Sequence, residues 1–241
     1  MEPIKHRIEH YWSHRAEGFQ ALRIREFQDE KHQRWLYEFN QYIPKDRLLR
    51  VLDLGTGTGF FAFIFAAEGH QATGIDLTPD MIRGARETAE VLGIEADFHI
   101  MDAEHPDFEP ESFDVLVTRN LTWTLPHLPE AYASWYHLLK PGGVLINFDA
   151  DYGRVLEEGD GEELPENHAH KLLDPFLKQE NDEITMEIAS YQMPRPQWDV
   201  QLLVEAGFEK ISVDMGVYRR IYREIDEFYN PVPIFTIAAY K

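Results

Sequence analysis

One stretch constrains this chain more than any other: Asp53-Leu54-Gly55-Thr56-Gly57-Thr58-Gly59, where three glycines alternate directly after an apolar run. The preceding residues, Leu48 to Leu54, predict a short buried strand, and Phe60 to Ala67 predict a buried helix. Strand, glycine-rich turn and helix form an arrangement in which the backbone comes close to a nucleotide-like ligand. Glycine suits the turn because it tolerates positive φ and has no Cβ to hold the ligand away. The stretch therefore predicts a ligand site at this turn.

A second strand with a terminal acid follows the turn. Residues 71–76 predict this strand, and Asp76 ends it about 20 residues after Gly55, close to the spacing of a ribose-binding acid in a βαβ unit. A helix is expected next, with Thr78 as its N-cap and an end at Gly93.

The rest of the chain continues the alternation of strands and helices. Further strands are expected at residues 96–100, 112–118 and 144–148, further helices at 132–139 and 197–206, and a closing hairpin at 209–217 and 234–240. Lys140-Pro141-Gly142-Gly143 predicts a turn into the fifth strand. This order favours an α/β fold with a doubly wound, mostly parallel sheet. Residues 1–47 predict one or two amphipathic helices, ended by Pro44.

Composition narrows the classes of partner. The chain has 43 acidic and 23 basic residues and a formal net charge of −20, which opposes binding to nucleic acid and to anionic membranes. It has no cysteine, so disulfides, thiolate zinc sites and a cysteine nucleophile are excluded. The N-terminus lacks the apolar core of a signal peptide, and no apolar run is long enough to span a bilayer. We therefore expect a soluble, cytoplasmic protein.

Five landmarks occur in register: the glycine turn with Asp53, the acid Asp76, Asp102-Ala103-Glu104, Phe113-Asp114-Val115, and Leu139 to Gly143. With them the chain resembles the class I S-adenosylmethionine (SAM)-dependent methyltransferases, well over residues 48–150 and loosely over 196–241. The resemblance implies a Rossmann-like methyltransferase fold with a seven-stranded sheet in a single methyltransferase domain. Residues 1–47 would form a helical cap, and 151–195 would be an insertion before the last helix.

The resemblance also implies roles for individual residues toward SAM and its product, S-adenosylhomocysteine. The glycine turn would hold the methionine part, Asp76 both ribose hydroxyls, and Asp102 with the Ala103 N–H the adenine, which Leu77 and Met81 would sandwich. The segment Tyr11 to Arg15 resembles one that covers the cofactor in small-molecule members, with Arg15 able to anchor a carboxylate. The full expected set is Tyr11, Trp12, Asp53, Gly55, Thr56, Gly57, Gly59, Asp76, Leu77, Met81, Asp102, Ala103, Glu104 and Asn120.

Simpler interpretations stay open for several of these residues. Asp76 and Asp102 would then only end strands or cap turns, Leu77 and Met81 would be core residues, and Tyr11 with Trp12 would only pack. A Rossmann dehydrogenase is disfavoured because its third glycine comes one residue later, where this chain has Phe60. A P-loop is excluded because no Gly-Lys-Ser/Thr follows the turn.

Three histidines near the N-terminus lie on one helical face, namely His6, His10 and His14. Ligands stacked along one straight helix lie too far apart to converge on one ion, so we expect no metal site there. His168 and His170 lie in the insertion and are candidates for the substrate site. A metal pair, a general base and a solvated acidic excursion are the open interpretations of these two residues. The insertion itself is expected to be a lid, a wall of the substrate site or a homodimer contact.

The substrate side is less readable. Asn120 and Trp123 follow the fourth strand, at the sheet edge where ligands bind, and Trp123 is either a substrate contact or loop packing. The Asn-Pro-Pro-aromatic motif of nucleic-acid amino-methyltransferases is missing there. Because the SAM sulfonium is already activated, a general base is needed only for a protonated acceptor, and His14, Asp149 and Tyr152 are its candidates.

The predicted function is methyl transfer from SAM to a small-molecule acceptor by in-line displacement. Two alternatives stay open: a protein or nucleic-acid methyltransferase, and a non-catalytic SAM-binding protein.

Overall fold

The computed structural model describes residues 2–154, 164–166, 168, 174–188 and 193–241. Its centre is a sheet with the strand order β3-β2-β1-β4-β5-β7-β6. The strands are β1 Arg50–Leu54, β2 Gln71–Asp76, β3 Asp97–Ile100, β4 Phe113–Arg119, β5 Leu139–Ala150, β6 Glu209–Asp214 and β7 Ile234–Tyr240. β1 to β5 pair in parallel, whereas β7 runs antiparallel to both of its neighbours. The prediction of a mostly parallel, seven-stranded sheet is confirmed.

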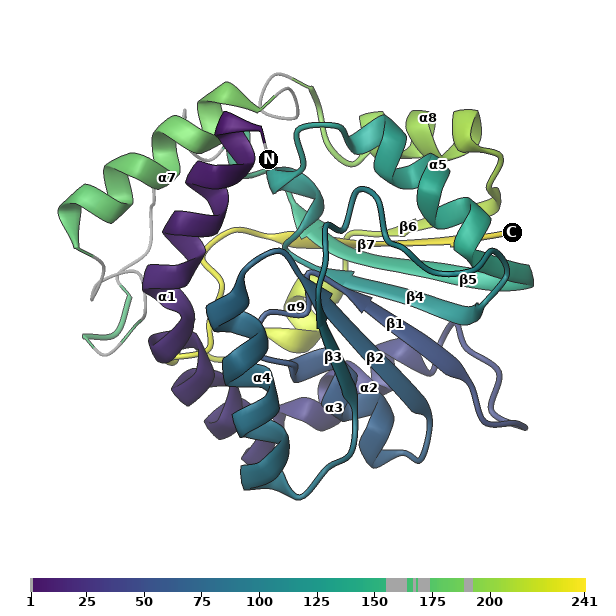
Figure 1. Ribbon diagram of the computed structural model, residues 1–241, viewed down its shortest axis with the longest axis horizontal. Coiled ribbons are helices and arrows are strands. Elements are labelled where there is room, and N and C mark those ends of the chain that lie inside the picture. The colour runs from purple at the N-terminus through teal and green to yellow at the C-terminus, as the bar shows by residue number, and fades with distance from the viewer. Residues whose placement is uncertain (1, 155–163, 167, 169–173, 189–192) are drawn as a thin grey trace.

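Helices cover both faces of the sheet (Figure 1). They are α1 Pro3–Gln28, α2 Lys31–Phe39, α3 Phe60–Ala67, α4 Pro79–Leu92, the 3-10 helix η1 Thr122–Thr124, α5 Leu128–Leu138, α7 Pro175–Glu187, α8 Gln197–Ala206 and α9 Val217–Ile221. α5 and α8 cover one face, and α2, α3 and α9 pack on the other. A sheet covered in this way buries both faces of its parallel strands, and the residues of β1 and β4 are accordingly almost all buried.

Aromatic side chains fill the core on the α3 side. The sequence of α3 is FFAFIFAA, and its rings pack edge to face against Trp35 and Phe39 of α2. Trp35 and Phe39 are fully buried, so α2 is a structural part of the core. This packing anchors the N-terminal helices to the sheet and so fixes where α1 crosses its carboxyl edge.

Several boundaries differ from the expectations. β5 begins at Leu139, because Leu139 pairs with Phe113 ahead of a bulge, so a turn over residues 140–143 was wrong. β6 ends at Asp214 and residues 217–221 are helical, so the last two strands pair as expected but are not joined by a tight hairpin. α4 ends at Gly93 as predicted.

α4 begins where the sequence predicts, at Pro79 after Thr78. Thr78 is its N-cap but makes no side-chain cap hydrogen bond. The Asp76 carboxylate accepts the Thr78 backbone N–H instead, at 2.9 Å. The acid at the end of β2 therefore caps the following helix.

α1 and α7 stand side by side at the carboxyl edge of the sheet (Figure 1). Arg7 of α1 bonds three glutamates of α7, namely Glu180, Glu183 and Glu187, at 2.7 to 3.1 Å. The described part of the insertion thus forms a wall beside α1. Among the described helices, none is both long enough and apolar enough to cross a membrane.

Candidate functional site

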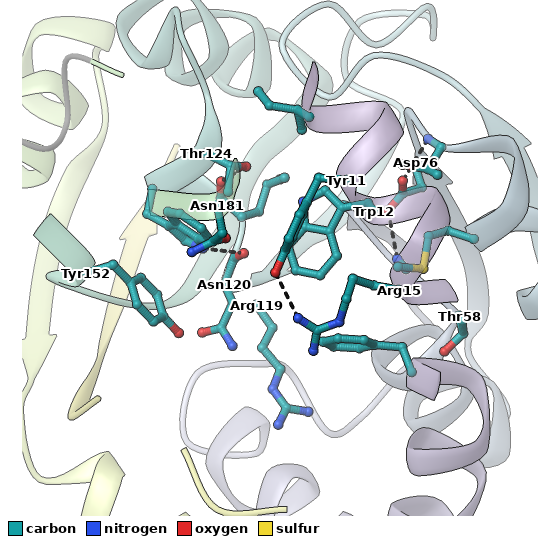
Figure 2. A pocket seen from close by; sticks show the side chains of 18 of the residues that line it. Tyr11, Trp12, Arg15, Thr58, Asp76, Arg119, Asn120, Thr124, Tyr152 and Asn181 are labelled. Atoms are coloured by element: carbon teal, nitrogen blue, oxygen red, sulfur yellow. Dashed lines mark hydrogen bonds between the residues drawn. The ribbon is translucent and has the colours of Figure 1, made fainter. Parts of the chain in front are cut away.

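A cavity of about 640 Å³ lies at the carboxyl edge of the sheet, beneath α1 and α7 (Figure 2). Its size is within the range of about 300–1,000 Å³ that is typical of small-molecule sites. Most of the sequence-predicted site residues line it: Tyr11, Trp12, Asp53, Gly55, Thr56, Gly57, Asp76, Leu77, Met81, Asp102, Ala103, Asn120, Trp123, Tyr152 and His168. Gly59, Glu104, His14 and Asp149 are not part of its lining. His170 lies outside the described residues.

The glycine turn owes its shape to three residues with positive φ: Gly55 at 64°, Gly57 at 54° and Gly59 at 94°. A Cβ on Gly55 would meet the Leu121 side chain at 2.6 Å, and one on Gly59 would meet Phe63 at 2.6 Å. A Cβ on Gly57 would find only the Met81 sulfur, at 3.9 Å. The missing Cβ of Gly55 and Gly59 therefore lets neighbouring side chains pack closely, whereas the missing Cβ of Gly57 leaves space on the cavity side.

Asp53 supports the turn from below. Its carboxylate accepts hydrogen bonds from the Thr56 hydroxyl at 2.6 Å and from the Ala62 N–H at 3.1 Å. Burial raises the pKa of Asp53 from 3.8 to about 7, although these hydrogen bonds act in the opposite direction. The side chain thus ties the turn to the first turn of α3.

Asp76 joins the turn to α4. Its two oxygens accept the N–H groups of Gly57 and Thr78, each at 2.9 Å. An ionised carboxylate offers about four lone-pair positions, so two remain for further donors such as ribose hydroxyls. Leu77 and Met81 lie next to it along the cavity wall.

The adjacent acid, Asp102, has a partner that the sequence did not suggest. Its Oδ1 accepts the Glu104 N–H at 2.9 Å, and its Oδ2 accepts Lys5 Nζ of α1 at 2.6 Å. Glu104 is fully buried behind it, in an ion pair with Lys5 and accepting the His127 N–H at 2.6 Å. Burial lowers the pKa of Lys5, but the bonds to both acids outweigh it and the net shift is upward. Lys5 thereby fixes the first turns of α1 over the Asp102 segment.

Further along α1, three side chains face the cavity (Figure 2). Arg15 donates to the Tyr11 hydroxyl at 2.8 Å, and the Trp12 ring packs edge to face against Tyr11 at 5.1 Å. His14 is exposed, and its Nδ1 lies 2.8 Å from the His10 carbonyl oxygen. Across the described residues, no group of three or more His, Cys, Asp or Glu side chains is placed to hold a metal ion.

The segment after β4 is held in an unusual conformation. Asn120 has φ of 53°, and its N–H donates to the Phe148 carbonyl at 2.8 Å. The indole N–H of Trp123 donates to the Asn120 carbonyl at 2.9 Å, and the Trp123 ring lies 4.8 Å from that of Tyr152. Strained backbone of this kind is concentrated at functional sites.

The three general-base candidates lie in different surroundings. Asp149 is fully buried and accepts the Thr122 hydroxyl at 2.5 Å and the Trp123 N–H at 3.1 Å, so it braces η1. Tyr152 lines the cavity and accepts Asn230 Nδ2 at 3.1 Å, and burial raises its pKa, which keeps the hydroxyl protonated. His14 is exposed and Asp149 lies behind the cavity wall. Of the three candidates, Tyr152 is therefore the one that lines the cavity, and its hydroxyl is neutral.

His168, a substrate candidate, is buried against the end of the chain. Its Nε2 lies 2.7 Å from the Tyr229 carbonyl oxygen, an arrangement in which Nε2 carries the proton and donates. The cavity is lined there by the stretch 227–232, which sequence analysis did not include. Arg23 and Arg119 were also missed, although a charged residue ending a parallel strand, as Arg119 does, is a readable signal.

Residues 51–143 match the family model described as a methyltransferase domain. This match identifies residues 51–143 as a methyltransferase domain of the class I SAM-dependent type. This region contains the glycine turn, Asp76 and Asp102.

Two curated methyltransferases illustrate the sequence likeness. The chain is 27% identical over 169 residues to the ubiquinone/menaquinone biosynthesis C-methyltransferase UbiE of Bartonella tribocorum, covering 68% of this chain and 65% of the relative. It is 38% identical over 101 residues to the ubiquinone biosynthesis O-methyltransferase of Xylella fastidiosa, covering 40% of each. The chain therefore matches less than two thirds of the length of these curated relatives.

A solved structure illustrates the likeness of fold. Phosphoethanolamine N-methyltransferase 2 of Haemonchus contortus, in complex with SAM, superposes with a TM-score of 0.60 at 21% identity, over 87% of this chain and 52% of that one. At this identity the likeness concerns the fold alone.

SAM is the cofactor of this family, and the cavity has features that fit it. The Thr58 hydroxyl and Asn120 Oδ1 are buried without a hydrogen-bond partner, and both residues line the cavity. Gly57 leaves space beside them, where any side chain would intrude. Buried polar groups without a partner are uncommon and indicate a missing ligand or water.

Proposed function

We propose that this chain transfers a methyl group from SAM to a small-molecule acceptor. The observation that carries the proposal is the continuity of one cavity. The same 640 Å³ space touches the glycine turn, Asp76 and Asp102 on one side and Trp123, Tyr152 and residues 227–232 on the other. A cofactor on the first side would thus share an enclosed space with an acceptor on the second.

The cofactor would be held by the residues that the family resemblance suggests. Asp76 would accept the ribose hydroxyls with its two remaining lone-pair positions, and the Asp102 segment would face the adenine. The main chain beside Gly57 would lie against the methionine part. Tyr11 and Trp12 would cover the cofactor from α1, and Arg15 would bind the methionine carboxylate.

Bound SAM would supply a methyl group on a sulfonium, which is already activated for displacement. The task left to the protein is to align the acceptor atom with the methyl group and to exclude water. The rings of Trp123 and Tyr152, which are tilted by 44° to one another, offer an aromatic wall for this purpose. The protonated Tyr152 hydroxyl would hold the acceptor by a hydrogen bond and would not remove its proton.

The covering helices favour a small acceptor over a macromolecule. α1 and α7 close the cavity from the outside and are bound together through Arg7, and the net charge of −20 opposes approach of nucleic acid. A protein acceptor and a non-catalytic SAM-binding role remain the alternatives. The cytoplasmic location and a homodimer remain predictions.

The test is to incubate the purified protein with methyl-labelled SAM and separate fractions of a cell extract. We expect label in the small-molecule fraction. Label only in protein or nucleic acid would overturn the choice of acceptor, and binding of S-adenosylhomocysteine without transfer to any fraction would favour the non-catalytic alternative. Absence of S-adenosylhomocysteine binding in calorimetry would contradict the proposal as a whole.

A further inference from the structure

Two arginines lie together on the cavity wall where α1 approaches the end of β4. Arg23 of α1 and Arg119 of β4 both line the cavity, and Arg119 is visible in Figure 2. Both guanidinium groups lie over the Phe60 ring, at 5.6 Å and 5.3 Å from its centroid. Burial lowers the pKa of Arg23, and the nearby charge of Arg119 lowers it further. The two cations therefore repel one another in a poorly solvated place.

One carboxylate serves both arginines, and it lies behind them. Glu26 is 1% exposed and is not part of the cavity lining. It forms an ion pair with Arg23, lies 3.4 Å from Arg119, and accepts the Trp35 indole N–H at 3.1 Å. The cluster thus has two cations and one anion, and only its cations face the cavity.

Arg119 retains a free donor. Its guanidinium stacks on Trp35 at 4.3 Å and donates to the Tyr222 hydroxyl at 3.1 Å. Its Nε is buried and has no hydrogen-bond partner. A buried donor on a cation is costly to leave unsatisfied, and an anion is the ligand that would satisfy both the donor and the charge.

The other charged groups that the structure describes in this half of the cavity cancel. Lys178 and Asp182 are a cation and an anion that both line the cavity from α7. Glu227 lies 2.7 Å from Arg25, which is outside the lining. Arg15 adds a third guanidinium, and it would bind the carboxylate of SAM under the proposed function. Among the residues that the structure describes, one positive charge, shared by Arg23 and Arg119, is left without an ion-paired carboxylate.

We propose that the methyl acceptor is a small organic anion whose carboxylate or phosphate group binds Arg23 and Arg119. This inference rests on the proposed function, since it takes the other half of the cavity for SAM. Phe60 and Tyr222 contact the arginines, and further aromatic rings line the same cavity, namely Trp123, Tyr152 and Phe228. An acceptor with an apolar or aromatic body and one anionic end fits these surroundings. This part of the cavity wall is positively charged, although the chain as a whole has a net charge of −20.

The test measures anion binding to the complex with S-adenosylhomocysteine. Saturating S-adenosylhomocysteine fills the cofactor half, so that its carboxylate does not compete for the observed site. Benzoate, phenyl phosphate and the neutral benzamide are then titrated calorimetrically into this complex. We expect one of the two anions to bind at one site per chain, about tenfold or more tightly than benzamide. Whichever anion binds more tightly identifies carboxylate or phosphate as the group.

The decisive variant is Arg23→Gln, because it removes the surplus cation and leaves Arg119 to neutralise Glu26. We expect it to weaken anion binding about tenfold. Arg119→Gln leaves the Arg23–Glu26 pair and is expected to act similarly, so one variant suffices if the other fails to fold. The matched control is Arg83→Gln, which removes an exposed arginine of α4 that pairs with Asp80 outside the cavity lining, and its anion affinity should be unchanged.

Three results would overturn the inference. One is that neither anion binds the S-adenosylhomocysteine complex more tightly than benzamide does. Another is equal anion affinity in the wild type and the Arg23→Gln variant. The third is that the anions bind only without S-adenosylhomocysteine or displace it, which would assign the arginines to the cofactor carboxylate. Failure of S-adenosylhomocysteine itself to bind is a different result, since that contradicts the proposed function.

Discussion

The carboxylate of Asp76 accepts the backbone N–H of Gly57 at 2.9 Å. This bond joins the acid that ends β2 to the middle of the glycine turn after β1. The other Asp76 oxygen accepts the Thr78 N–H, so one side chain connects β2, the turn and the start of α4. A side chain in this position shapes the turn and faces the cavity at the same time.

Replacing Asp76 with alanine is therefore expected to weaken S-adenosylhomocysteine binding more than about tenfold, since two charge-assisted hydrogen bonds would be lost. Isothermal titration calorimetry measures this directly. Asp80→Ala is the matched control, because Asp80 lies on the first turn of α4, outside the lining, and pairs with Arg83 at 2.7 Å. An unchanged affinity of the Asp76→Ala variant would contradict the ribose assignment.

Substitutions in the glycine turn can separate effects on packing from effects on cofactor binding. In Gly57→Ala the new methyl group would enter the cavity, so we expect cofactor affinity to fall, with about 1–2 kcal/mol lost in stability from the positive φ. In Gly59→Ala the methyl group would meet Phe63 at 2.6 Å, so stability should fall further. Urea denaturation and calorimetry on both variants give the comparison. Equal effects of the two changes on affinity and stability would contradict the distinction.

The parts of the structure that sequence predicted well are those with a local cause. α4 runs from Pro79 to Leu92 because a proline begins it and Gly93, at φ of 66°, ends it. α8 ends at Gly207 for the same reason. The glycine turn and the acids after β2 and β3 were also readable, because a strand end in a parallel sheet fixes which edge its next residue reaches.

The parts that were missed depend on contacts between distant segments. Lys5 and Asp102 are 97 positions apart and meet only because α1 crosses the sheet edge. Glu104 was expected at the cofactor, but its bonds to Lys5 and the His127 N–H hold it away from the cavity. Arg23 and Glu26 resemble an ordinary surface pair at i and i+3. Only the fold buries them beside Arg119.

Arg195 is expected to be essential for stability. Its side chain is 1% exposed and donates to both oxygens of Asp199 and to the Thr122 hydroxyl, while Asp149 lies 3.6 Å away. Arg195→Met would leave two carboxylates buried without their cation, which costs about 3–5 kcal/mol. Chemical denaturation measures the loss.

The control for this variant is Arg219→Met, since Arg219 is exposed. We expect a change within about 0.5 kcal/mol for this control. Because Asp149 braces η1, Arg195→Met should also alter the fluorescence of Trp123. A variant as stable as the wild type would show that the buried carboxylates tolerate the loss of the arginine.

Asp53 is expected to make stability depend on pH. Its pKa is raised by burial from 3.8 to about 7, so the folded state binds its proton more tightly than the unfolded state does. The stabilising contribution is fully present below pH 3.8 and is lost as the pH rises through about 7. Asp53→Asn cannot titrate, so the wild type should lose more stability than the variant between pH 5 and pH 8, by at most about 3 kcal/mol. Chemical denaturation at both pH values measures this difference. The control is Asp97→Asn, because Asp97 is exposed. Parallel pH profiles of the wild type and Asp53→Asn would refute the raised pKa.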